Sequence, residues 1–289
     1  MPDFTSGFDD LIASSHAVID AALDAGAHSV TPLLSGGHDS MSACLVASMH
    51  KAFSGEVFHI DTGIGARATR HYIEARCAEY GWKLRVFKSN FSYERFVMEK
   101  GFPSPGAHQW IYNRLKDRAL YSITKGRGRT ALIAGCRQHE SVRRMGHVEP
   151  LQIGETSKKT GNVRNTNRLW TNPCWDWTSD TQKAFLDALD VERNPIKMSP
   201  LAMSGECFCG AFARPNEIQL IQKYAPDVAE EIERLEVLAE PHGGRCKWGT
   251  RAKGEKGIVI APTGPMCSSC DFKAAASGIV LEDSFASTY

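Results

Sequence analysis

The sequence predicts an α/β protein with a doubly wound, mostly parallel sheet, helices on both faces and a cysteine-bearing C-terminal helical extension. Short apolar runs alternate strictly with stretches of helical apolar spacing, which is typical of a parallel sheet covered by helices. The apolar runs end in turns that contain glycine or aspartate, and four cysteines form two close pairs after residue 200. We therefore expect two domains, residues 1–200 for the α/β part and residues 201–289 for the cysteine-bearing helical segment.

The composition is that of a globular protein. The chain has 289 residues, of which 42% are hydrophobic and 23% charged, and its formal net charge of +1 favours no particular partner. No apolar run is long enough to cross a bilayer and the N-terminus lacks a signal-peptide pattern, so we expect a cytoplasmic protein without a membrane partner. Nine cysteines in such a chain suit a metal site in a reducing compartment better than a disulfide framework.

Apolar spacing predicts the elements in chain order. The expected helices cover residues 8–25, 41–53, 66–80, 109–124, 180–189, 217–224 and 228–238, and the expected strands cover 28–34, 57–60, 83–87 and 130–134. Thr178 or Ser179 is expected to cap the helix that begins at residue 180. The polar stretch 150–166 is expected to be a mobile connection that could contact a substrate.

The first predicted strand runs through the turn Ser35-Gly36-Gly37-His38-Asp39-Ser40 directly into a helical pattern. Two glycines let the backbone come close to an anion, and the positive end of the following helix favours phosphate. The spacing matches neither the Walker motif nor the dinucleotide fingerprint. Taken alone, the turn could equally be an ordinary connection capped by Asp39 or Ser40.

Polar residues also follow later strands. Asp61-Thr62-Gly63 comes after the second strand, and a run from Gly135 to Arg144 comes after the fourth. Ligands bind at the carboxyl ends of parallel strands, and arginines there can fork onto phosphate or sulfate oxygens. The alternatives are that Asp61 caps the next helix and that the arginine run is a basic surface loop paired through Glu140. Lys116, on a predicted helix, could likewise belong to a solvated face.

These motifs resemble the PP-loop ATP pyrophosphatases (adenine nucleotide alpha hydrolase-like), and among them the PAPS reductase-like branch of the iron-sulfur type. The loop matches the pattern S-G-G-x-D-S with His38 at the variable position. The arginine run matches G-x-R-x-x-E-S-x-x-R, and a Pro followed by a D-W-T turn at residues 173–178 has the reductase-like order. The resemblance extends over about residues 28 to 215.

The resemblance implies an adenine-nucleotide site in residues 1–200, with ATP and Mg²⁺ or a sulfonucleotide as substrate. The implied nucleotide-binding residues are Ser35, Gly36, Gly37, His38, Asp39, Ser40, Asp61, Thr62, Gly63, Gly135, Arg137 and Glu140. The implied catalytic residues are Asp39, Lys116, Arg137 and Arg144. The lysine and the arginines would balance the charge that develops on the phosphates.

The cysteine pairs Cys207/Cys209 and Cys267/Cys270 lie in Gly-rich turns separated by two predicted helices, which would bring the second turn back towards the first. Four thiolates suit either Zn²⁺ or an iron-sulfur cluster, and spacing does not separate the two. The resemblance to PP-loop enzymes that handle sulfur favours a [4Fe-4S] cluster, with Zn²⁺ as the alternative. The other cysteines considered are Cys246, close to His242, as the main substitute ligand, Cys44 as a core residue, and Cys174 and Cys136 as further candidates.

Two departures from the sulfonucleotide reductases bear on the expected activity. Trp110-Ile111-Tyr112-Asn113 stands where assimilatory APS reductases carry adjacent cluster-binding cysteines, and no cysteine follows Cys270 to match their C-terminal E-C-G nucleophile. Because sulfonate transfer needs such a thiol, we expect an ATP pyrophosphatase that adenylates an acceptor for iron-sulfur-dependent sulfur transfer, as in the resembling DNA-phosphorothioation and tRNA-thiolation enzymes. The alternatives are a PAPS or APS reductase that makes sulfite and a nucleotide-binding regulatory protein with structural zinc.

The expected partners are an adenine nucleotide, a nucleic acid acceptor, a sulfur-donor or electron-transfer protein and, through a helix such as 8–25, a second copy of the chain. Basic residues at 158–168 and 245–256 favour the nucleic acid. Both stretches could equally be plain solvated surface.

Overall fold

The computed structural model describes residues 7–138, 149–156, 162–213 and 217–249, and the chain forms two compact units. The first unit consists of residues up to 60, 72–87 and 120–193. The second consists of residues 61–71, 88–119 and the described residues from 194 onward. Each unit therefore combines separate stretches of the sequence, and the expected division near residue 200 into a nucleotide-binding and a cysteine-bearing domain stays a prediction.

A mostly parallel sheet belongs to the first unit. β1 (Ser29–Pro32) pairs in parallel with β4 (Thr130–Ile133), and β4 pairs in parallel with β6 (Val163–Thr171), which pairs antiparallel with β5 (Leu151–Thr156). β2 (Glu56–Asp61) and β3 (Lys83–Lys88) form a two-stranded ladder, and a parallel bridge between Leu33 and Phe58 joins it to the end of β1. The expected α/β class with a mostly parallel sheet is confirmed.

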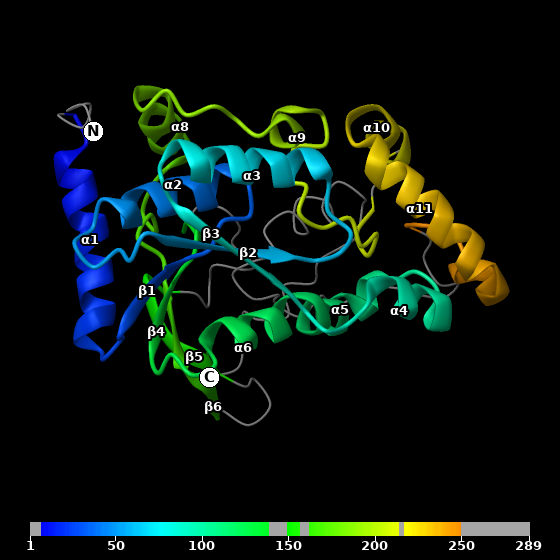
Figure 1. Cartoon of the computed structure of the whole chain (residues 1–289), viewed down its shortest axis with the longest axis horizontal. Coiled ribbons are helices and arrows are strands. Elements are labelled where there is room, and N and C mark those ends of the chain that lie inside the picture. Colours follow the sequence, from blue (N-terminus) through cyan, green and yellow to red (C-terminus); the bar gives the residue numbers. More distant parts are fainter. Residues whose placement is uncertain (1–6, 139–148, 157–161, 214–216, 250–289) are drawn as a thin grey trace, which may run out of the picture. The chain divides into compact units, whose positions relative to one another are not determined.

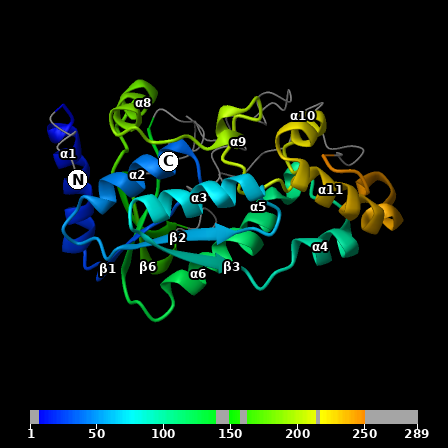
Figure 2. The ribbon, with the colours of Figure 1, turned by 45° about the horizontal axis from the view of Figure 1, so that its top comes forward.

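Helices cover both sides of these strands. In Figures 1 and 2, α3 (Arg67–Glu79) and α6 (Arg118–Thr124) lie on opposite sides of β2 and β3. α1 (Asp9–Asp24) packs on β4, β6 and α2 (His38–Ser48), and α8 (Ser179–Ala188) packs on α2. Thr178 caps α8 as predicted, since its Oγ1 accepts a hydrogen bond from the Thr181 amide at 3.0 Å.

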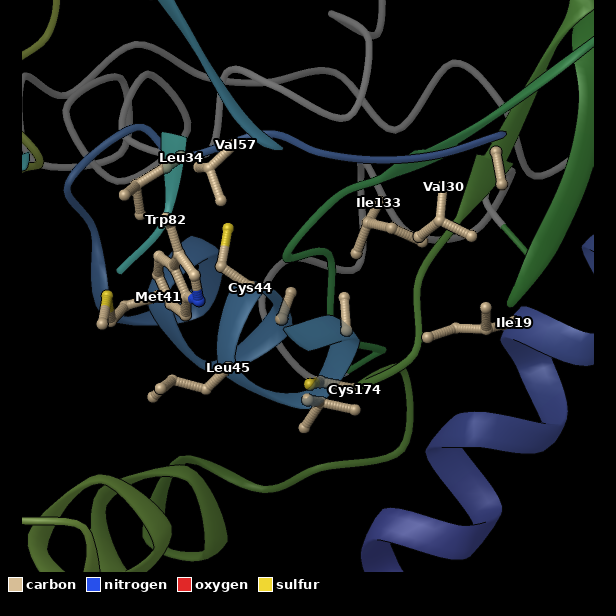
Figure 3. Close-up of a cluster of buried hydrophobic side chains, with 14 of the residues drawn as sticks. Ile19, Val30, Leu34, Met41, Cys44, Leu45, Val57, Trp82, Ile133 and Cys174 are labelled. Carbon is tan, nitrogen blue, oxygen red and sulfur yellow. The ribbon is translucent and has the colours of Figure 1, made fainter. Parts of the chain in front are cut away.

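The core of the first unit is built around α2. All eight residues from Ser40 to Ala47 are buried, because this segment carries small and apolar side chains on every side. Figure 3 shows Met41, Cys44 and Leu45 of this helix among apolar side chains of the surrounding strands, and Cys44 is a core residue as expected. Burial of this kind stabilises the fold by about 25 cal/mol per Å². It therefore fixes the N-terminal end of α2, and the loop before it, on the sheet.

Short helices surround the core of the second unit. They are α4 (Tyr93–Lys100), α5 (His108–Tyr112), α9 (Pro195–Met198), α10 (Glu217–Tyr224) and α11 (Pro226–Ala239), with 3-10 turns at Pro105–Ala107 and Glu240–Arg245. α10 and α11 confirm the two helices predicted for the C-terminal extension. α4 was not predicted from the sequence, and Ser92 caps it by accepting a hydrogen bond from the Arg95 amide at 3.1 Å. Across the described residues, no helix combines the length and the apolar character needed to cross a membrane.

The single helix predicted over residues 109–124 is interrupted. α5 leads into a π-helical turn, η2 (Asn113–Asp117), before α6 begins. Leu115 and Lys116 on this turn are only 2% and 4% exposed, so Lys116 does not belong to a solvated helix face. π turns of this kind are frequent at functional sites.

The stretch 150–166, predicted to be a mobile connection, contains an edge hairpin in its described residues instead. β5 pairs antiparallel with β6 there, with an irregular register between Ile153 and Glu155. These strands were not predicted because their composition is polar, and an antiparallel edge strand that faces solvent carries polar side chains. Arg168, counted among the basic surface residues, is 2% exposed and pairs with Glu155 at 3.3 Å.

Candidate functional site

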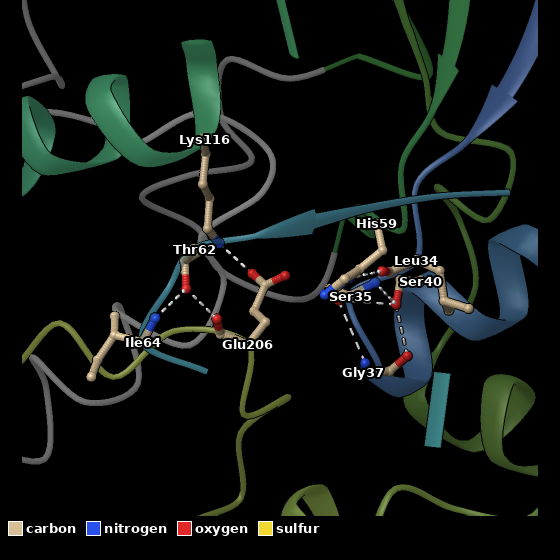
Figure 4. Close-up of polar contacts among 9 residues, drawn as sticks. All are labelled: Leu34, Ser35, Gly37, Ser40, His59, Thr62, Ile64, Lys116 and Glu206. Carbon is tan, nitrogen blue, oxygen red and sulfur yellow. Dashed lines mark hydrogen bonds and ion pairs between the residues drawn. The ribbon is translucent and has the colours of Figure 1, made fainter. Parts of the chain in front are cut away.

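The turn from Ser35 to Ser40 forms a closed loop between β1 and α2. The Ser40 hydroxyl donates to the Gly37 carbonyl oxygen at 2.9 Å and accepts from the Ser35 amide at 3.1 Å, and the two serine hydroxyls lie 3.0 Å apart (Figure 4). Gly36 has a φ of +84°, a conformation that favours glycine. The start of α2 at Gly37 has no capping side chain, and Arg137 pairs with the one carboxylate of its first turn, Asp39, so the helix end suits a bound anion.

His59 supports the loop from the neighbouring strand. It is 5% exposed, and its Nδ1 lies 2.8 Å from the carbonyl oxygen of Leu34, the residue before the loop (Figure 4). Since a carbonyl can only accept, this contact requires the proton on Nδ1. Sequence reasoning missed His59, because a histidine inside an apolar strand carries no signal that separates it from any core histidine.

Two donors hold Asp39 in the first turn of α2. Its Oδ1 accepts hydrogen bonds from Arg137 Nε at 2.5 Å and from Gln182 Nε2 at 2.9 Å. The guanidinium of Arg137 also donates to the Trp177 carbonyl oxygen at 3.3 Å, and Arg137 is 6% exposed. The structure thus joins two of the predicted site residues, Asp39 and Arg137, and adds Gln182, which the sequence analysis did not single out.

Gly135 lies directly against the same turn. A Cβ atom on this residue would be within 2.5 Å of the Asp39 carbonyl oxygen and of the Ser40 amide nitrogen. The backbone after β4 can therefore approach the loop this closely only because position 135 has no side chain. His38, at the variable position of the motif, is the first residue of α2 and is half-buried.

The predicted residues at the end of β2 belong to the second unit and form a tight turn. The Asp61 carboxylate accepts a hydrogen bond from the Gly63 amide at 2.7 Å, and Gly63 has a φ of +76°. The Thr62 hydroxyl donates to the main-chain carbonyl oxygen of Glu206 at 2.6 Å (Figure 4). These bonds fix the turn and attach it to the segment that carries the first cysteine pair.

Lys116 forms a buried ion pair with Glu206 in this second unit (Figure 4). Only 5% of the lysine side chain and 7% of the glutamate side chain are exposed. A single buried charge loses its hydration without compensation, so each of these groups depends on the other. Sequence reasoning missed Glu206, because a glutamate in a Gly-rich turn gives no sign of a partner 90 residues away.

Residues 29–199, more than half of the chain, match the family model of the phosphoadenosine phosphosulfate (PAPS) reductase domain. The chain belongs to the PAPS reductase family. This confirms the resemblance seen in the loop and strand-end motifs and identifies the protein as a member of a family of nucleotide-binding enzymes. No curated protein matches the sequence.

Two solved structures are similar to this member of the PAPS reductase family. The phosphate complex of PAPS reductase from Candida auris is 19% identical with a TM-score of 0.46, and the alignment covers 65% of this chain and 88% of that one. The U34-tRNA thiolase NcsA from Methanococcus maripaludis, with its [4Fe-4S] cluster, is 17% identical with a TM-score of 0.39. That alignment covers 93% of this chain and 89% of the thiolase.

In this PAPS reductase family member, backbone hydrogen bonds place the first cysteine pair beside the turn after β2. The Phe208 amide donates to the Ile64 carbonyl oxygen, and the Ala66 amide donates to the Gly205 carbonyl oxygen, both at 2.8 Å. A Cβ atom on Gly65 would lie 2.8 Å from the Glu206 carbonyl oxygen, so glycine permits this close approach. Residues 205–208 are consequently held along residues 62–66.

Cys207 and Cys209 are the described part of the predicted metal site. Cys207 is half-buried and Cys209 is buried. Burial raises the pKa of the Tyr93 hydroxyl well above its ordinary value, and the nearby Cys209 and Cys207 thiols raise it further. The binding of one metal centre by these two thiols stays a prediction.

The remaining parts of the predicted site stay predictions. Within the described ranges, no three His, Cys, Asp or Glu side chains gather as a metal site. Cys246, the substitute ligand, is half-buried in the second unit. The predicted residues that lie outside the described part of the chain are Glu140, Arg144, Cys267 and Cys270.

Cys44 and Cys174 are expected to resist alkylation in the folded protein. Burial raises the pKa of both thiols well above the ordinary range, and the Asp39 carboxylate raises that of Cys174 further. Because the thiolate is the form that reacts with alkylating agents, both thiols should react slowly. Iodoacetamide at mildly alkaline pH should label Cys207 of the metal-free protein, as read by peptide mass spectrometry. Labelling of Cys174 at the same rate before unfolding would contradict this assignment.

Proposed function

We propose that the protein is an ATP pyrophosphatase that adenylates an acceptor for sulfur transfer. The observation that carries the proposal is the loop from Ser35 to Ser40, with the Asp39 carboxylate in the first turn of the helix that follows. A carboxylate beside phosphates favours a metal-bound nucleotide, because Mg²⁺ is bound by carboxylate and phosphate oxygens together. Mg·ATP meets this requirement, and the positive end of α2 suits its pyrophosphate.

In the proposed reaction an acceptor oxygen attacks the α-phosphorus of ATP. The bond from that phosphorus to the bridging oxygen breaks, and pyrophosphate leaves with the electron pair. The loop and Mg²⁺ stabilise the charge on the pyrophosphate, while Lys116, Arg137 and Arg144 neutralise phosphate charge as the family resemblance implies. A sulfur nucleophile then displaces AMP from the adenylated acceptor, so that sulfur replaces the acceptor oxygen.

The proposed cofactor is a [4Fe-4S] cluster. Cys207 and Cys209 would hold it together with Cys267 and Cys270, and when bound it would supply a site that carries sulfide for the transfer. The protein's own part is to orient the thiols. Besides the backbone bonds of residues 205–208, the Tyr93 hydroxyl donates to the Cys209 carbonyl oxygen at 2.7 Å.

A sulfonucleotide reductase is the second candidate function, favoured by the description of the family model and by the bonds that hold Cys207 along the turn after β2. In that reaction a cysteine thiolate attacks the sulfonate sulfur, the S–O bond breaks, and the nucleotide phosphate leaves. A second thiol then displaces sulfite and forms a disulfide, which a dithiol protein of the thioredoxin class reduces.

Anaerobic purification with metal analysis, followed by parallel assays with ATP and PAPS, separates these functions. We expect a brown protein that releases pyrophosphate from Mg·ATP, more rapidly when a nucleic acid is present. Ser35→Ala and Asp39→Ala should each lower the turnover by about 100-fold or more. Ser48→Ala, which removes a hydroxyl bonded to the Leu45 carbonyl oxygen at the other end of α2, should behave like the parent.

Two results would overturn the proposal. Sulfite from PAPS without pyrophosphate from ATP would establish the reductase. A colourless zinc protein that turns over neither nucleotide would establish the regulatory alternative.

A further inference from the structure

A second candidate binding site lies entirely within the second unit, between α4 and the stretch from α5 to the start of α6. It is a pocket of about 730 Å³, within the range of roughly 300–1,000 Å³ that is usual for ligand sites. Phe91, Phe96 and Trp110 form its aromatic wall. None of these residues belongs to the nucleotide loop or to the cysteine turns.

Trp110 is the accessible part of this wall. It is 41% exposed, whereas Phe96 is 7% exposed. The indole ring lies edge-to-face on Phe91, with ring centroids 5.4 Å apart, and is 5.0 Å from the Phe96 ring. These two contacts hold the indole in place while part of its surface stays open to solvent. A fixed, exposed aromatic ring of this kind is a stacking platform for a nucleobase.

Cationic side chains surround the platform. They are Arg95, Lys100, Arg114, Arg118 and Arg245. The one carboxylate of the lining, Glu99, accepts a hydrogen bond from Arg95 at 2.7 Å. Five cations against one carboxylate favour an anionic ligand.

The position of Arg114 indicates what kind of anion fits. Its guanidinium carbon lies 4.9 Å from the centroid of the Trp110 ring, so a planar cation is held against the aromatic surface. Arginine planes and aromatic rings together are typical of sites that stack unpaired bases and bind the adjacent phosphates.

We propose that this pocket binds a single-stranded nucleic acid, with a base stacked at Trp110 and backbone phosphates on the surrounding cations. A single strand fits because its bases are accessible for stacking, whereas those of a duplex are not. The cations come from α4, from the stretch η2 to α6 and from the turn at Arg245, a spread that suits successive phosphates of a strand better than the phosphate of one mononucleotide. The role of this pocket as the acceptor site rests on the proposed function. The binding of a single strand to the pocket does not depend on the reaction with ATP.

Fluorescence anisotropy with labelled single-stranded DNA and RNA of about twelve nucleotides, a length within the range bound by typical single-strand sites, tests the proposal on the full chain without ATP. Trp110→Leu and Arg114→Gln should each raise the Kd by about tenfold. Because phosphate contacts release counterions, the Kd should also rise steeply between about 50 and 200 mM salt.

Two variants outside the pocket serve as controls. Tyr121→Leu removes an aromatic ring that is 58% exposed, and Arg127→Gln removes a guanidinium that lies 5.1 Å from the Phe58 ring. Both should bind the strand like the parent. Absence of binding by the parent, unchanged binding by Trp110→Leu and Arg114→Gln, or AMP competing as strongly as the oligonucleotide would each overturn the proposal. Since no ATP is present, these outcomes are independent of the pyrophosphate assay.

Discussion

Replacing Gly135 with alanine is expected to abolish nucleotide binding at the loop. The new methyl group would overlap the backbone of Asp39 and Ser40, and neither side of this contact can move freely. α2 is buried all round and all four residues of β4 are buried, so the loop itself has to shift. A displacement of about 1 Å at a reacting group can lower the reaction rate by about 100-fold. Overpacking lowers the free energy of unfolding by about 1–3 kcal/mol. Calorimetric titration with ATP and urea unfolding measure the two effects.

Gly7→Ala is the matched control, because no atom lies within 4 Å of the position that its Cβ would occupy and its φ is not in the left-handed region. This variant should bind ATP and unfold like the parent. If Gly135→Ala bound ATP with the parental Kd, the loop from Ser35 to Ser40 would not be the nucleotide site.

The elements of the first unit and the loop could be predicted because their signals are local. Alternating apolar runs set the parallel strands, and glycines set the turn before α2. Asp39 and Arg137, 98 residues apart, were both assigned to the nucleotide site because they follow the carboxyl ends of parallel strands, but the hydrogen bond between them was not predicted. Gln182 and Glu206 could not be found in this way, since each acts through a distant partner and the residues around each carry no motif.

The errors of prediction have a similar cause. The hairpin of β5 and β6 has a polar sequence because much of its side-chain surface faces solvent, and composition alone cannot separate such an edge from a connection. The π turn at Asn113–Asp117 also lacks a local signal. Yet this π turn carries the buried Lys116, which is one of the predicted catalytic residues.

Removing the charge of Lys116 is expected to lower the free energy of unfolding by roughly 3–5 kcal/mol, because Glu206 would remain buried without a counter-charge. Lys116→Met keeps the length and the apolar stem of the side chain. Glu206→Met should have an effect of similar size, and it keeps the Thr62 bond because that bond goes to the main-chain carbonyl. Urea unfolding followed by tryptophan fluorescence measures both. Arg234→Met is the control, since its pairs with Glu94 and Glu231 are both exposed to solvent and should together contribute only about 1 kcal/mol.

The double variant Lys116→Met/Glu206→Met separates the structural role of the pair from a chemical role of the lysine. Replacing a buried ion pair with apolar side chains is often neutral, so stability should return close to that of the parent. A lysine that neutralises phosphate charge would still be missing, and pyrophosphate release should stay about 100-fold or more below the parental rate. A stable double variant with the parental rate would confine Lys116 to holding the turn and the cysteine segment together. A stable but inactive double variant would mean that Lys116 also acts in the reaction, and that Glu206 serves to compensate the buried charge of this lysine.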